Sequence, residues 1–185
     1  MTDELTDTLR EIIAQLEAQG IEYMLVGSVA ALAHGRSRST RDFDLVIEAG
    51  PAQLRAFARA LPDDRFYVAE EAALEALRYE TQFNVIDMAT GWKVDLIPRK
   101  DREFSQAEFA RRTRLAVLGV PMFVATIEDT IVAKLEWAKA GGGSERQLED
   151  VRGLLELAGD DLDRAYVAAW VAKLGLETMW TRVGD

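Results

Sequence analysis

The sequence lacks cysteine altogether and contains a single histidine, His34. Without cysteine the chain has no disulfide bond, no thiolate nucleophile and no cysteine-based zinc site. The lone histidine has no second ligand at zinc spacing, so we interpret it as a structural or helix-capping group. Long apolar runs are missing as well, since no stretch approaches the roughly 20 residues that a membrane-spanning helix requires.

We expect no signal peptide, because the acidic start Met-Thr-Asp-Glu-Leu-Thr-Asp has neither a basic nor an apolar segment. We therefore expect a cytoplasmic protein with no membrane role. The 185 residues, 49% of them hydrophobic, are of single-domain size. A chain of this length buries roughly 70% of its unfolded surface, which is enough for a genuine core.

Basic residues are fewer than acidic ones, 22 against 32, and the net charge is -10. This balance opposes unselective binding to nucleic acid, which depends on neutralising many phosphates. Basic side chains nevertheless gather in two segments: Arg36, Arg38 and Arg41, then Arg99, Lys100, Arg102, Arg111, Arg112 and Arg114. We expect the first segment to meet phosphate, while the second suits phosphate or a solvated helix face equally well.

The apolar pattern predicts an α+β half followed by a helical half. Helices are predicted over residues 4–19, 29–34 and 51–61, and strands over 21–26, 42–48, 83–88, 92–97 and part of 114–124. Further helices are predicted over residues 127–140, 144–158, 161–173 and 175–183. We expect a small mixed sheet with flanking helices, forming a catalytic core of residues 1–125, and a C-terminal helical region of residues 126–185.

The first motif with chemical potential is Val26-Gly27-Ser28, at an expected turn from strand to helix. Glycine permits a tight turn and a close backbone approach. Amides at a helix start and the Ser28 hydroxyl can bind phosphate oxygens. Alone the motif is commonplace, because Ser28 also suits a helix N-cap.

The second motif is the pair Asp42 and Asp44 at the start of a predicted strand. Residues two apart share one face of a strand, about 6.6 Å apart along the backbone, while Phe43 between them faces the core. Two neighbouring carboxylates repel unless a cation lies between them. Mg²⁺ is held by one or two carboxylates together with water and substrate phosphates. The pair therefore predicts a phosphoryl-transfer site.

A third carboxylate would position or deprotonate the attacking hydroxyl. We favour Asp95, because an acid in an apolar strand is costly if it is buried without a partner. Asp87 on the neighbouring strand is the competing candidate, and its place beside the hairpin loop suggests exposure to solvent.

Together these motifs resemble the nucleotidyltransferase superfamily of the polymerase-beta type. The family pattern is an apolar residue, Gly-Ser, a spacer and Asp-x-Asp, which here is Val26-Gly27-Ser28, thirteen residues, then Asp42-Phe43-Asp44. The resemblance implies a nucleoside triphosphate as substrate and the following site residues: Gly27, Ser28 and Arg41 for the nucleotide, and Asp42, Asp44 and Asp95 for catalysis and two Mg²⁺ ions.

The helical half resembles minimal bacterial nucleotidyltransferases related to abortive-infection toxins of the AbiEii type, through residues 128–137 and 144–150. That resemblance implies nucleotide-handling roles for Lys134, Arg146 and Asp150. The alternative is a surface lysine and an Arg146–Asp150 contact one helical turn apart, worth about 0.3 kcal/mol.

Tryptophans offer a further set of candidates for base stacking. Trp137, Trp170 and Trp180 lie among apolar residues at helical spacing, and we interpret them as helix packing. Trp92 on the predicted hairpin is freer to stack on a base.

The sequence thus predicts Mg²⁺-dependent transfer of a nucleoside monophosphate to an acceptor hydroxyl, with pyrophosphate leaving. A tRNA end, a protein hydroxyl or a small molecule would suit the site, and the toxin-like resemblance points to tRNA or protein and to a cognate antitoxin as partner. The alternative is a catalytically silent module that binds nucleotide or protein on the same fold. Such a module is expected to lack Ser28 or one of the acids, and all of them are present.

Overall fold

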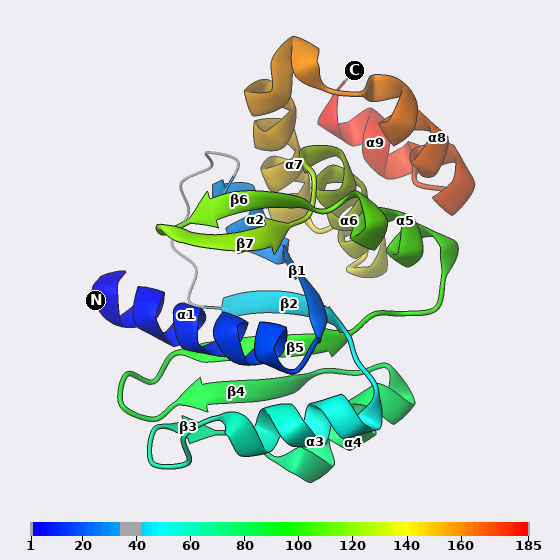
Figure 1. Cartoon of the computed structure of the whole chain (residues 1–185). Coiled ribbons are helices and arrows are strands. Elements are labelled where there is room, and N and C mark those ends of the chain that lie inside the picture. The colour runs from blue at the N-terminus through cyan, green and yellow to red at the C-terminus, as the bar shows by residue number, and fades with distance from the viewer. Residues whose placement is uncertain (1, 34–41, 185) are drawn as a thin grey trace.

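The computed structural model describes residues 2–33 and 42–184, and it confirms the expected α+β class (Figure 1). A seven-stranded mixed sheet forms the centre of the molecule. Helices flank this sheet, and those of the C-terminal third gather beyond one end of it (Figure 1).

The regular elements follow one another closely along the chain. The strands are β1 (Glu22–Val26), β2 (Asp42–Glu48), β3 (Phe66–Tyr67), β4 (Phe83–Asp87), β5 (Lys93–Pro98), β6 (Thr113–Val117) and β7 (Val120–Val124). The helices are α1 (Thr2–Ala18), α2 (Gly27–Ala33), α3 (Pro51–Ala60), α4 (Glu70–Tyr79), α5 (Glu103–Arg111), α6 (Ile127–Ala140), α7 (Glu145–Ala158), α8 (Arg164–Leu174) and α9 (Glu177–Val183), with a 3-10 turn at Gly159–Asp161.

Three elements, β3, α4 and α5, lie in segments for which the apolar pattern predicts no regular structure. Helix α4 buries only two alanines. Helix α5 buries the polar side chains Ser105 and Glu108 beside its two phenylalanines. Helix α5 lacks the continuous apolar stripe that marks an amphipathic helix in a sequence. Helix α4 has a short one, formed by Ala73, Ala76 and Leu77. The remaining predicted elements are present, most of them within two residues of their expected bounds.

The strand order β3-β4-β5-β2-β1-β7-β6 places β2 between β5 and β1. Strand β2 runs parallel to β5, and this pairing aligns Asp44 with Asp95. It runs antiparallel to β1, where Val26 is opposite Asp44. Because side chains directly opposite one another in a sheet point to the same face, Val26, Asp44 and Asp95 form a row across three strands.

The two faces of the sheet differ in chemistry. One face carries Phe43, Leu45, Val94 and Leu96, all buried in the main apolar core to which α1 and α3 contribute. The opposite face carries the row that contains Asp44 and Asp95. The alternation of strand side chains therefore places the acids on the face away from the main core.

The C-terminal helices α6 to α9 have an apolar core of their own, which includes Leu135, Leu154 and Trp170. Phe104 of α5 also packs into this core, so a division of the chain at residue 126 stays a prediction. Among residues 2–33 and 42–184, no helix combines the length and the apolar character needed to cross a membrane.

Asp129 links three helices at the start of α6. Its carboxylate is fully buried. It accepts hydrogen bonds from the Thr126 hydroxyl at 2.7 Å, from Arg111 Nε of α5 at 3.2 Å and from the Tyr166 hydroxyl of α8. A charge this deeply buried is tolerated because several donors surround it. The network fixes α5, α6 and α8 relative to one another.

Asp87 is also fully buried, which shows that its expected exposure was wrong. It lies on the core face of β4, opposite in direction to Asp95, and accepts hydrogen bonds from the Thr8 hydroxyl at 2.6 Å and from Arg65 at 2.8 Å. The backbone N–H of Ala89 donates a third bond at 3.0 Å. Burial favours the protonated carboxyl, but these donors outweigh it and lower the pKa of Asp87. The residue ties α1 to the sheet.

Replacement of Asp87 by alanine is expected to lower the free energy of unfolding by about 3 kcal/mol, because Thr8 and Arg65 lose a buried charged partner. Urea denaturation followed by circular dichroism measures the change. The control Asp63→Ala removes an exposed carboxylate of a turn and is expected to change stability by at most about 0.5 kcal/mol. Equal stability of the two variants would contradict a structural role for Asp87.

Candidate functional site

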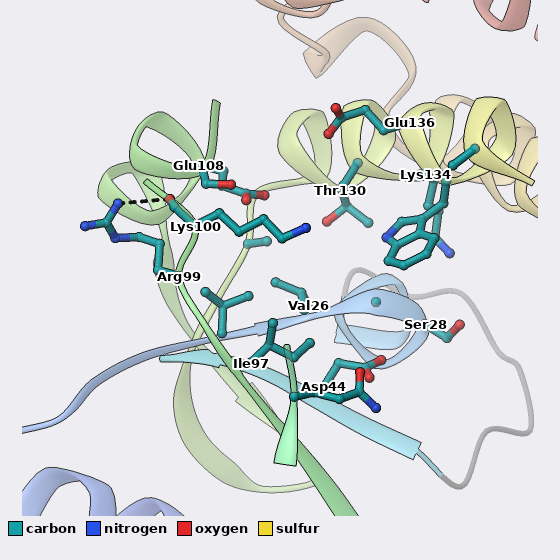
Figure 2. Close-up of a pocket in the computed structure, with 18 of the residues that line it drawn as sticks. Val26, Ser28, Asp44, Ile97, Arg99, Lys100, Glu108, Thr130, Lys134 and Glu136 are labelled. Atoms are coloured by element: carbon teal, nitrogen blue, oxygen red, sulfur yellow. Dashed lines mark hydrogen bonds between the residues drawn. The ribbon is translucent and has the colours of Figure 1, made fainter. Parts of the chain in front are cut away.

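A cavity of about 610 Å³ lies between the acid-bearing face of the sheet and helices α5 and α6 (Figure 2). Its floor includes Val26, Asp44 and Ile97 from three adjacent strands. Glu108 of α5 and Lys134 of α6 belong to the opposite walls. A cavity of this volume falls within the range of small-molecule sites.

Asp44 and Asp95 are neighbours on β2 and β5. The Asp95 carboxylate is 7% exposed and accepts hydrogen bonds from Lys93 Nζ at 3.0 Å and from the Asn84 amide. The Gln82 amide lies 3.5 Å away. Two adjacent carboxylates repel each other, and the Lys93 ammonium offsets part of that repulsion.

Gly27 brings the turn after β1 against the Asp44 carboxylate. It has φ +72°, a conformation that favours glycine, and a Cβ built at this position would overlap Asp44 Oδ2. The Asp44 Cγ atom lies 3.3 Å from that Cβ position. The Gly-Ser turn and the second aspartate of the Asp-x-Asp motif are thus in direct contact, and Ser28 lines the cavity beside them (Figure 2).

Lys134 is almost wholly buried on α6, at the cavity wall. Its Nζ donates to Asp150 Oδ2 of α7 at 2.7 Å and to Gln147 Oε1 at 3.3 Å. The structure therefore brings Lys134 to the cavity, with Asp150 behind it as a partner. Arg146 is exposed on α7 and is not among the described residues that line the cavity.

Several predicted site residues lie partly or wholly outside the described residues. The backbone of Asp42 belongs to β2, but its side chain is not described, and Arg41 lies outside the described residues together with His34, Arg36 and Arg38. Among the side chains that are described, no group of three or more acidic or histidine residues forms a metal site. Two members of the predicted triad, Asp44 and Asp95, are adjacent.

Glu108 is a site residue that the sequence does not reveal. It is 8% exposed and lies at the cavity wall. Burial raises the pKa of Glu108 to about 7, the carboxylates of Asp129 and Glu136 add to the rise, and Arg102 and the Ser105 hydroxyl oppose it. The sequence does not indicate Glu108 as a site residue because its apolar pattern predicts no helix where α5 lies.

Most of the second basic segment is committed to ion pairs inside the molecule. Arg99 pairs with Glu48 at 3.0 Å and Arg102 pairs with Glu136 at 2.6 Å. Arg111 and Arg112 also contact carboxylates, those of Asp129 and Glu22. Lys100, in contrast, extends into the cavity below Glu108 (Figure 2).

Two of the tryptophans lie in surroundings that differ from those expected. Trp170 is buried in the helical core as expected, whereas Trp137 of α6 is 68% exposed and lines the cavity. Trp92, expected to be free, packs edge-on against the core residue Phe43. Helical spacing placed Trp137 on the right helix but on the wrong face.

No protein-family model and no curated protein matches the sequence. Solved structures match its fold. The solution structure of the antibiotic-resistance factor ANT(2'')-Ia is 17% identical, with a TM-score of 0.58 over 98% of this chain and 99% of that chain. The crystal structure of ANT(2'')-Ia with adenylyl-2''-tobramycin is 18% identical, with a TM-score of 0.59 over 93% and 99%.

A nucleotidyltransferase-like protein from Paracoccidioides brasiliensis is 18% identical, with a TM-score of 0.56 over 93% of this chain and 87% of that chain. These likenesses establish that the chain has the nucleotidyltransferase fold. The fold expected from the Gly-Ser and Asp-x-Asp motifs is thereby confirmed, whereas the roles of individual residues rest on the chemistry of the site.

Replacement of Gly27 by alanine is expected to destabilise the protein more than replacement of Gly91. Both glycines have positive φ, +72° and +75°, but a Cβ at Gly91 meets nothing within 4 Å. Gly91→Ala therefore lowers the free energy of unfolding only through the strain of a positive φ, by roughly 1–2 kcal/mol. Gly27→Ala adds the overlap with Asp44. Equal unfolding free energies in urea would show that the contact between the turn and Asp44 is not constraining.

Replacement of Glu108 by glutamine is expected to change how stability depends on pH. The folded chain binds the Glu108 proton more tightly than the unfolded chain between its ordinary pKa of 4.5 and about 7. The wild type therefore loses stability as pH rises through this window, by at most about 3 kcal/mol. Glu108→Gln should remove that loss, and unfolding in urea at pH 5 and pH 8 measures it.

The matched control for Glu108 is Glu156→Gln, which neutralises an exposed carboxylate on α7. This control is expected to keep the wild-type dependence on pH. If Glu108→Gln keeps it as well, the proton on Glu108 does not contribute to stability.

Proposed function

We propose that the protein is a nucleotidyltransferase that moves a nucleoside monophosphate from a nucleoside triphosphate to the hydroxyl group of a small acceptor. The observation that carries this proposal is the position of Asp44, which lines the cavity, contacts the Gly27 turn and is paired in the sheet with Asp95. The fold of the structural neighbours supports the same reaction class.

The acids of this site suit Mg²⁺. Asp42, Asp44 and Asp95 supply the hard oxygen ligands that this ion prefers, and the Lys93 ammonium already lies against Asp95 as a cation would. Lys93 is 39% exposed and has room to swing away. When bound, Mg²⁺ ions supply charge that stabilises the attacking and leaving oxygens of such a transfer.

The reaction joins the acceptor oxygen to the α-phosphorus and breaks the bond from that phosphorus to the bridging oxygen, so that pyrophosphate leaves. Asp95 is assigned to orient the acceptor hydroxyl and to take up its proton. Ser28 is assigned to hold the leaving phosphates by its hydroxyl. Lys134, at the cavity wall, neutralises their charge, and Asp150 keeps its ammonium in place.

A small acceptor agrees better with the described surface than tRNA does. The arginines of the segment 99–112 contact carboxylates of the same chain, whereas tRNA binding needs basic groups directed at phosphates. Glu108 at the cavity wall suits an acceptor that carries amines or hydroxyls, since a buried carboxyl near neutrality can accept their hydrogen bonds. The tRNA or protein acceptor and the antitoxin partner implied by the toxin resemblance stay testable alternatives.

The test incubates the protein with Mg²⁺, each nucleoside triphosphate labelled at the α-phosphate, and either tobramycin or total tRNA. Label is expected to move to the small acceptor. Asp44→Asn and Asp95→Asn should each lower the initial rate at least about a hundredfold, because each removes charge that acts in the transition state. The control Asp161→Asn, in the exposed 3-10 turn, should keep the wild-type rate.

Transfer to tRNA alone would replace the small acceptor by the toxin-like one. If nucleotide binds in the presence of Mg²⁺ but no acceptor is labelled, including proteins of a cell lysate, the catalytically silent binding module becomes the better account. Full activity of Asp44→Asn would contradict the assignment of the site itself.

A further inference from the structure

Trp137 has an exposure that packing does not account for. Its side chain is 68% exposed although it lies on α6, a helix that buries eight of its residues. Exposing an indole forgoes a large gain in apolar burial. Trp92 and Trp170 both have aromatic rings packed edge-on against them. In the part of the chain that the structure describes, neither a ring nor a cation stacks on Trp137.

The position of Trp137 relates it to the proposed phosphate site. It follows Lys134 by three residues, so the two side chains share one face of α6 and are separated by one turn, about 4.5 Å of helix rise. Both line the same cavity. A triphosphate held between Ser28 and Lys134 therefore leaves its nucleoside within reach of the indole.

The base is the part of a nucleoside triphosphate best suited to contact the indole of Trp137. The indole is the single aromatic ring among the described residues that line the cavity. A nucleobase is the flat aromatic part of a nucleotide, and base–aromatic stacking is worth about 1–3 kcal/mol per base. Ribose and phosphate gain little from such a surface.

We propose that Trp137 is the stacking platform for the base of the bound nucleoside triphosphate. This inference rests on the proposed function and extends it to nucleotide preference. Stacking strength follows the area of the base, so purine nucleotides bind more tightly than pyrimidine nucleotides. Discrimination between adenine and guanine is weak, since a π face carries no hydrogen-bond pattern.

The test measures dissociation constants by calorimetry in the presence of Mg²⁺ for three probes: ATP, CTP and inorganic triphosphate. Trp137→Leu is expected to weaken ATP binding about tenfold, to weaken CTP binding less, and to leave inorganic triphosphate unchanged. Trp137→Phe should restore most of the ATP affinity, because it keeps an aromatic face. ATP should also quench tryptophan fluorescence in the wild type and much less in Trp137→Leu.

The matched control is Tyr79→Leu, which removes an aromatic ring that is 62% exposed and lies outside the cavity. It should leave all three dissociation constants unchanged. Thermal unfolding of each variant checks that the fold is intact, and both positions are exposed enough for the substitutions to be tolerated.

Three outcomes would overturn the inference. Equal weakening of ATP and triphosphate by Trp137→Leu would mean that the residue only shapes the cavity. Unchanged ATP affinity together with weaker tobramycin binding would place the indole against the acceptor. Failure of the wild type to bind any of the three probes would contradict the proposed function as well, whereas the first two outcomes leave the proposed function standing.

Discussion

The register between β2 and its two neighbours determines which side chains form the floor of the cavity. Val26, Asp44 and Asp95 form one row because β1 and β5 are both paired with β2 in a fixed alignment. A slip of one residue would turn the acids into the main core and bring Phe43 to the cavity floor. The apolar residues on the other face make that slip costly, so the core itself holds the acids where they are.

The cavity lies where two apolar cores meet. The core under the sheet fixes the floor, and the core of the C-terminal helices fixes the wall formed by α6. Helix α6 serves both purposes, since Leu135 packs inward while Lys134 and Trp137 face the cavity. The Lys134 ammonium is stabilised across helices by Asp150. Asp44, Lys134 and Trp137 are thus supplied by a strand and a helix, which keeps their positions well defined.

Local sequence motifs were enough to predict the fold. The direction in which a single side chain points was harder to predict, because it depends on packing. Gly27 and the Asp-x-Asp motif predicted the fold because their spacing is distinctive. The preference for Asp95 over Asp87 was a matter of strand face, and only the pairing of β4 and β5 shows that they point in opposite directions. Glu108 was not predicted as a site residue because a helix that buries polar side chains has no clear apolar periodicity. The exposure of Trp137 was not predicted because Leu135 and Ala138, which are buried, lie close to it in the sequence.

The network around Asp129 limits how such a protein can evolve a new acceptor. Hydrogen bonds from Arg111 and Tyr166 to Asp129 hold α5, α6 and α8 together. The helices that form the cavity walls therefore cannot shift independently of one another. A larger acceptor must be accommodated by exchanging individual lining side chains. Glu108 and Glu136 are among the large lining side chains of α5 and α6 that such an exchange could shorten. Relatives that keep the Asp129 network are therefore expected to differ in acceptor through a few substitutions on α5 and α6, with the backbone around the cavity nearly unchanged.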